Sequence, residues 1–145
     1  MRALVQRVSR ASVRSEGELV GTIGKGLCVL IGVTHKDSES HAAKLASKIW
    51  NLRIIDDQNG VMNLSVAEAS GEVLIVSQFT LYGDTNSGRR PSWINAARPE
   101  VAEPLVERLI SELRRLGAHV ETGRFRTEME VELVNDGPVT VMIEV

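Results

Sequence analysis

The segment TEMEVELVNDGPVTVMIEV, residues 127–145, carries a strand pattern that decides the fold class of this chain. Met129, Val131 and Leu133 alternate strictly with glutamates, which predicts one buried face and one face in water. The closing VTVMIEV is also strand-like. Asn-Asp-Gly-Pro stands between them, although proline cannot donate to a strand ladder and glycine weakens a strand. We therefore expect two short strands joined by a plain turn, or a backbone segment that is displayed to a ligand.

The rest of the sequence adds further strands and two helices. The apolar run LCVLIGV at 27–33 predicts a strand covered on both faces. Helices are expected from Asp37 or Ser38 to about Leu52, and from Pro99 to Gly117. Further strands are expected at residues 2–13, 61–66 and 72–81, and a loop at 83–98. This predicts a compact α+β single domain over residues 1–145, with two main helices on a largely antiparallel, barrel-like sheet.

Composition narrows the function classes. The net charge of −2 excludes a strongly basic nucleic-acid binder, but seventeen lysines and arginines leave room for a local basic patch, for example around GRRPSW. No apolar run reaches the roughly 18–20 residues that cross a bilayer, and no signal peptide is evident. A single cysteine, Cys28, allows no intrachain disulfide. We expect a cytoplasmic protein without membrane contact.

The usual catalytic side chains are scarce. His35, His41 and His119 are scattered without metal-ligand spacing, and Cys28 lies in an apolar run, where an inert core role is expected. Asp56 and Asp57 are typical of a turn. We therefore expect neither a metal nor a cofactor.

Two short segments remain as candidates. Polar residues end an apolar strand in SQFTL at 77–81, where binding groups are often displayed. In NDGPVT at 135–140, the glycine can adopt positive φ and the Gly-Pro bond is the place where a cis peptide costs least. Each segment is weakly specific by itself.

Together, these two segments resemble the paired signatures of the D-aminoacyl-tRNA deacylase family. The likeness extends over the chain, through ALVQRVSRASV, KGLCVLIGV, VMNLSV, GRRPSW and TGRF. One departure is Trp93, where phenylalanine is expected after Arg-Pro-Ser. The resemblance implies hydrolysis of the ester that joins a D-amino acid to the 3′-terminal ribose of tRNA.

The resemblance also implies a homodimer with its active sites at the interface. The bond between Gly137 and Pro138 would be cis, and their carbonyl oxygens would enter the pocket of the other subunit. An L-aminoacyl group would collide with these oxygens, whereas D-aminoacyl and glycyl groups would fit. Arg7 would brace the loop. Asn135, Val139 and Thr140 complete the substrate-binding motif.

Four residues of the other motif would form the catalytic segment: Ser77, Gln78, Phe79 and Thr80. Their main-chain N–H groups, that of Phe79 above all, would stabilise the oxyanion of the ester. Phe125 and Met129 would contact the terminal adenine. Because no base can be paired with Thr80, attack by water assisted by the 2′-hydroxyl of the tRNA is preferred over a covalent nucleophile.

Two alternatives stay open at this point. One is a conventional esterase with Ser77 or Thr80 as a covalent nucleophile. The other is a non-catalytic RNA-binding module with the same fold, against which the net charge argues mildly.

Overall fold

A computed structural model describes residues 1–145. Eight strands, two α-helices and one 3₁₀ turn follow in the order β1 (Arg2–Ser15), β2 (Glu18–Ile23), β3 (Gly26–Gly32), α1 (Glu39–Asn51), β4 (Ile55–Asp56), β5 (Met62–Leu64), β6 (Glu72–Ser77), η1 (Phe79–Tyr82), α2 (Pro99–Arg115), β7 (Val120–Thr122) and β8 (Met129–Glu144).

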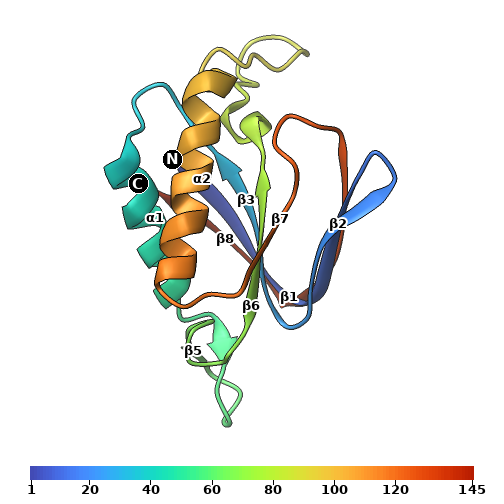
Figure 1. Ribbon diagram of the computed structural model, residues 1–145, viewed down its shortest axis with the longest axis vertical. Helices are drawn as coiled ribbons and strands as arrows, with labels where there is room; N and C mark the ends of the chain where they lie inside the picture. Colours follow the sequence, from blue (N-terminus) through green and yellow to red (C-terminus); the bar gives the residue numbers. More distant parts are fainter.

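The long strand β1 organises the six-stranded sheet (Figure 1). β8 pairs with β1 along almost its whole length, and the other edge of β1 is shared by β3 and β2. These three pairings are antiparallel, whereas β3 pairs with β6, and β6 with β7, in parallel. The sheet is therefore mixed, with antiparallel pairing concentrated around β1.

The sheet curls until its edges nearly meet, as the barrel-like prediction required. A Cβ built on Gly21 of β2 would lie 3.0 Å from the main-chain oxygen of Thr122 in β7, so only glycine allows these strands to come this close. The interior of the curl is a small core that includes Val13, Cys28 and Leu74.

A larger core lies between the sheet and the two helices, which cover one face of the sheet (Figure 1). α1 contributes Leu45 and Ile49, and α2 contributes Leu109 and Leu113, all of them fully buried. β3 sends side chains into both cores, which confirms that this strand is covered on both faces. α1 begins after Ser38 and α2 begins at Pro99, as predicted.

Two element boundaries were predicted wrongly. The strand expected at 72–81 ends at Ser77, because the Gln78 N–H still donates to Ile31 O at 2.7 Å but the following residues fold back into η1. The two short strands expected around Asn-Asp-Gly-Pro are one strand, β8, interrupted by a bulge. Thr140 pairs with Gln6 and Asn135 with Val8, so residues 136–139 face the single residue Arg7.

The predicted class, a compact α+β fold with a barrel-like sheet and two main helices, is confirmed. Both ends of the chain lie side by side, where the Val145 N–H donates to Met1 O at 3.1 Å (Figure 1). Neither helix has the length and hydrophobicity that a membrane crossing requires.

Candidate active site

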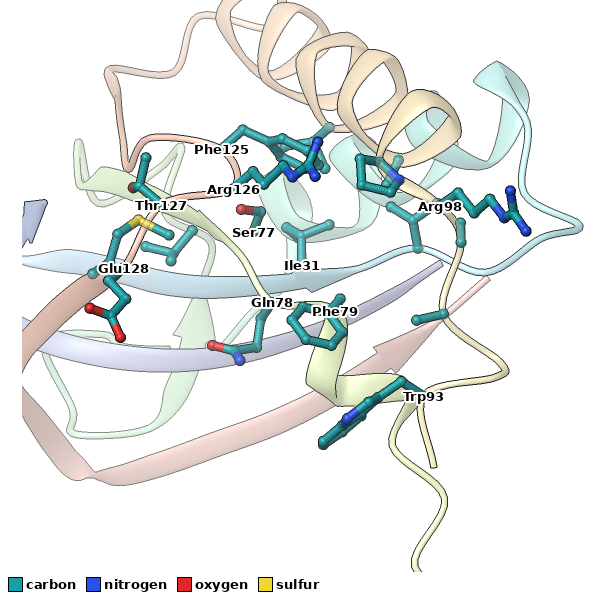
Figure 2. A pocket seen from close by; sticks show the side chains of 18 of the residues that line it. Ile31, Ser77, Gln78, Phe79, Trp93, Arg98, Phe125, Arg126, Thr127 and Glu128 are labelled. Atoms are coloured by element: carbon teal, nitrogen blue, oxygen red, sulfur yellow. The ribbon is translucent and has the colours of Figure 1, made fainter. Parts of the chain in front are cut away.

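A pocket of about 690 Å³ opens between the end of β6, the start of α2 and the turn before β8 (Figure 2). Twelve of its nineteen lining residues are hydrophobic. Ser77, Gln78 and Phe79 line it, and so do Phe125 and Met129. Five of the predicted site residues therefore surround one pocket, which has the apolar walls and few polar groups of a small-molecule site.

The catalytic segment predicted at 77–80 runs from the last residue of β6 into η1. The Gln78 N–H is occupied by Ile31 O, whereas Phe79 and Thr80 open the 3₁₀ turn, where the first N–H groups have no partner within the turn. Thr80 is not among the residues that line the pocket, and its hydroxyl is held by the side-chain amide of Gln78. Phe79 is 56% exposed and packs edge-on against Trp93, with ring centroids 5.4 Å apart.

The pocket offers little side-chain chemistry. Its lining contains no histidine, cysteine or lysine, and Glu128 is its single carboxylate. No base forms a hydrogen bond with the Ser77 hydroxyl. The pairing of nucleophile and base that a serine or threonine esterase needs is therefore absent around this pocket.

The histidines and the cysteine have structural surroundings. His41 Nδ1 accepts from the Ser38 N–H at the start of α1, and the His35 ring lies 2.8 Å from Ile94 O. Cys28 is fully buried, and this burial raises the pKa of its thiol to about 11. At neutral pH it is a protonated core residue, as the sequence predicted.

The bulge at 136–139 is held by Arg7, whose residue exposure is only 7%. Its Nε donates to Asp136 O at 3.2 Å, and its Nη1 donates to Ile54 O at 2.9 Å. Nη1 also forms an ion pair of 3.0 Å with Asp56. Charged donors make stronger hydrogen bonds than neutral ones, so Arg7 fixes the base of the bulge firmly.

Asn135 closes the bulge from within. Its Nδ2 donates to Val139 O at 2.9 Å and to Arg7 O at 3.0 Å, and its Oδ1 accepts from the Thr140 hydroxyl at 3.1 Å. These bonds join the two ends of the bulge to β1. The predicted group of Arg7, Asn135, Val139 and Thr140 is thus one hydrogen-bonded unit.

Gly137 and Pro138 form the tip of the bulge, and the bond between them is cis. Gly137 has a φ of 115°, and a Cβ at this position would lie 2.7 Å from Arg7 Nη2. Both the conformation and the close approach therefore require glycine. No side chain donates to the carbonyl oxygen of Gly137 or Pro138, and the strand pairing passes over both residues.

The predicted site residues thus form two groups within the chain. Neither Gly137 nor Pro138 lines the pocket that contains Ser77 and Phe79. Trp93, Arg98 and Arg126 also line it and were missed as site residues, because nothing in a loop-like sequence shows which of its side chains face a pocket. Asp56 was interpreted as a turn residue, and its pairing with Arg7 spans 49 positions.

Comparison with known proteins defines the class. The model of the D-Tyr-tRNA(Tyr) deacylase family matches residues 4–144, so this α+β chain with its pocket at the end of β6 belongs to that family. The predicted family and the prediction of an enzyme of this class are thereby confirmed.

Relatives and solved structures agree over nearly the full chain. A D-aminoacyl-tRNA deacylase of Symbiobacterium thermophilum is 60% identical over 99% of this chain and 95% of its own length. One of Halalkalibacterium halodurans is 55% identical over 99% of both chains. A structure described as c-Myc DNA unwinding element binding protein is 38% identical, with a TM-score of 0.95 over 100% of this chain and 99% of its own. A probable eukaryotic D-amino acid tRNA deacylase, 18% identical with a TM-score of 0.85 over 99% of this chain and 98% of its own, shares the fold.

Proposed function

We propose that this protein hydrolyses the ester bond of D-aminoacyl-tRNA, and of glycyl-tRNA, and rejects L-aminoacyl-tRNA by steric collision with the backbone. The activity would reside in one domain, residues 1–145, acting in the cytoplasm without a cofactor. The observation that carries this proposal is the bulge at 136–139. It presents two carbonyl oxygens that no side chain occupies, on a base that Arg7 and Asn135 hold in place.

The oxygens of Gly137 and Pro138 would act from a second copy of the chain, because they do not line the pocket of their own copy. Two features support a homodimer. The edge of β8 that faces away from β1 is unpaired over a 16-residue strand, and such edges are usually covered. Val134 and Met142 on the same strand are exposed apolar side chains.

Discrimination would follow from the position of Cβ. A D-aminoacyl group would turn its side chain away from the two oxygens and offer its amino group to them as a hydrogen-bond donor. An L-aminoacyl group would drive Cβ into a backbone that cannot move, since Arg7 is buried beneath it. Glycine has no Cβ, so glycyl-tRNA would pass.

The chemical step would use the backbone. The scarcity of acid–base side chains in the pocket favours attack by water, assisted by the free 2′-hydroxyl of the terminal ribose. Main-chain donors at Phe79 and Thr80 would stabilise the oxyanion, and one such donor is worth about 3–4 kcal/mol in other hydrolases. Phe125 and Met129 would hold the terminal adenine.

A side-by-side assay tests this function. Purified protein is incubated with D-tyrosyl-tRNA, L-tyrosyl-tRNA and glycyl-tRNA at equal concentrations, and the remaining ester is measured over time. We expect rapid loss of the D-tyrosyl and glycyl esters, with the L-tyrosyl ester decaying at the rate seen without protein. Equal hydrolysis of the D- and L-tyrosyl esters would refute the backbone filter.

A further inference from the structure

Arginine partners are unevenly distributed over the molecule. Nine of the thirteen arginines have a carboxylate, carbonyl or amide oxygen of the chain as a partner. The other four, Arg89, Arg90, Arg98 and Arg126, have no hydrogen bond or ion pair from their side chains. A guanidinium group with five donors and no acceptor is well suited to bind an external anion.

These four residues gather at one place, the mouth of the pocket. Arg98 and Arg126 line the pocket itself, Arg98 where the loop meets α2 and Arg126 in the turn before β8 (Figure 2). Arg89 and Arg90 lie on the exposed loop that also brings Trp93 to the pocket. We call these four residues the arginine rim.

The positive charge of the rim is a local feature, because the chain as a whole carries a net charge of −2. Asp84, on the same loop, is occupied within its turn, where it accepts from the Asn86 N–H at 2.9 Å and from Asn86 Nδ2 at 2.8 Å. Glu128 is the one carboxylate in the pocket lining. Four cations face it, so the mouth of the pocket attracts anions.

We infer that the arginine rim binds the phosphates of the single-stranded 3′ end of tRNA, next to the terminal adenosine in the pocket. This inference rests on the proposed function. A terminal adenosine in this pocket would leave the preceding phosphates at its mouth, where guanidinium groups contact phosphate oxygens in a bidentate manner. The rim would therefore select a polynucleotide over a free nucleoside ester, whereas the bulge would select handedness.

The test compares two substrates that differ in their phosphates. One is D-tyrosyl-tRNA, and the other is the D-tyrosyl ester of adenosine, which has none. For the double variant Arg89→Ala/Arg90→Ala, we expect the ratio of kcat/KM on tRNA to kcat/KM on the adenosine ester to fall at least tenfold. The slope of log kcat/KM for tRNA against log salt concentration should decrease by about 1.4, from roughly 0.7 per phosphate contact on a single strand.

Two controls make the result specific. Lys44→Ala/Lys48→Ala removes the same charge from α1, away from the pocket, and should leave both the ratio and the slope at wild-type values. Arg89→Lys/Arg90→Lys keeps the charge and should retain most of the salt slope. Unfolding temperatures, compared across all variants, show whether a loss reflects folding.

An unchanged ratio and an unchanged slope in a folded Arg89→Ala/Arg90→Ala variant would overturn the arginine rim while the deacylase function stands. Wild-type protein that hydrolyses neither D-tyrosyl ester would overturn the proposed function and the rim together. A wild-type protein that cleaves the adenosine ester as efficiently as the tRNA ester would also overturn the rim.

Discussion

Arg7 on β1 donates through Nε to the main-chain oxygen of Asp136 at 3.2 Å, across 129 positions of sequence. The same guanidinium reaches Ile54 O and Asp56, so one buried cation joins the bulge of β8 to the segment after α1. The position of the Gly137 and Pro138 carbonyl groups therefore depends on a side chain that is far from them in sequence.

Replacing Arg7 with alanine should reduce both stability and discrimination. The change leaves two main-chain oxygens and Asp56 without their charged donor, and we expect the free energy of unfolding to fall by about 2–3 kcal/mol. Hydrolysis of L-tyrosyl-tRNA should rise relative to that of D-tyrosyl-tRNA, because the bulge becomes mobile. Chemical denaturation and paired kinetic assays measure the two effects.

Arg10→Ala is the matched control for Arg7→Ala. Its side chain is 66% exposed and lies 3.8 Å from Glu132, so its loss should cost less than about 1 kcal/mol and leave discrimination unchanged. If Arg7→Ala behaved in the same way as Arg10→Ala, the bracing role of Arg7 would be wrong.

Asn135→Asp changes the bulge with almost no change in volume. The substitution replaces the Nδ2 donor with an oxygen that faces the carbonyl oxygens of Arg7 and Val139, which repel it. We expect a loss of about 1–3 kcal/mol in the free energy of unfolding and weaker rejection of the L-tyrosyl ester. Gln58→Glu, an amide-to-acid change on an exposed turn, should affect neither quantity.

Side-chain and backbone variants of the catalytic segment should behave differently. Ser77→Ala and Thr80→Val remove hydroxyl groups that no base activates, so we expect kcat to fall less than tenfold. Phe79→Pro removes a main-chain N–H instead, and kcat should fall roughly 100-fold or more. Complete loss of turnover in a folded Thr80→Val protein would restore the covalent nucleophile as the better explanation.

Glu112 gives the stability a dependence on acid pH. A hydrogen bond from Arg115, with a further charge on Arg108, holds the pKa of its carboxyl below the ordinary value. Because the folded-state pKa is depressed, the contribution is present above the ordinary glutamate pKa of about 4.3 and is lost as the pH falls through the folded-state value. The difference in Tm between wild type and Glu112→Gln should therefore be greatest near neutral pH and shrink below about pH 4. A constant difference from pH 7 to pH 3 would exclude this coupling.

The sequence predicted those parts of the fold that depend on local pattern. The two helices start where Ser38 and Pro99 place them, and β3 is covered on both faces, as its apolar run indicates. The end of β6 at Ser77 was missed, because strand-forming residues continue to Leu81 and only the backbone turn stops the strand.

The site could be predicted in its motifs but not in its architecture. The bulge required knowledge of which residues of β1 oppose Asn135 and Thr140, and register between distant strands is not readable from either strand alone. Arg7 was assigned through family resemblance, whereas Asp56 and the arginine rim became visible only when distant segments were brought together.

Complementation between subunits tests the central claim that the bulge of one copy acts in the pocket of another. Phe79→Pro disables the pocket, and Gly137→Ala displaces the bulge, because its Cβ would lie 2.7 Å from Arg7 Nη2. Each variant alone should be nearly inactive on D-tyrosyl-tRNA. After the two proteins are mixed and allowed to exchange subunits, random pairing should restore about a quarter of the wild-type sites, because half of the dimers contain one intact site of two. Activity no greater than the sum of the two separate variants would contradict the account.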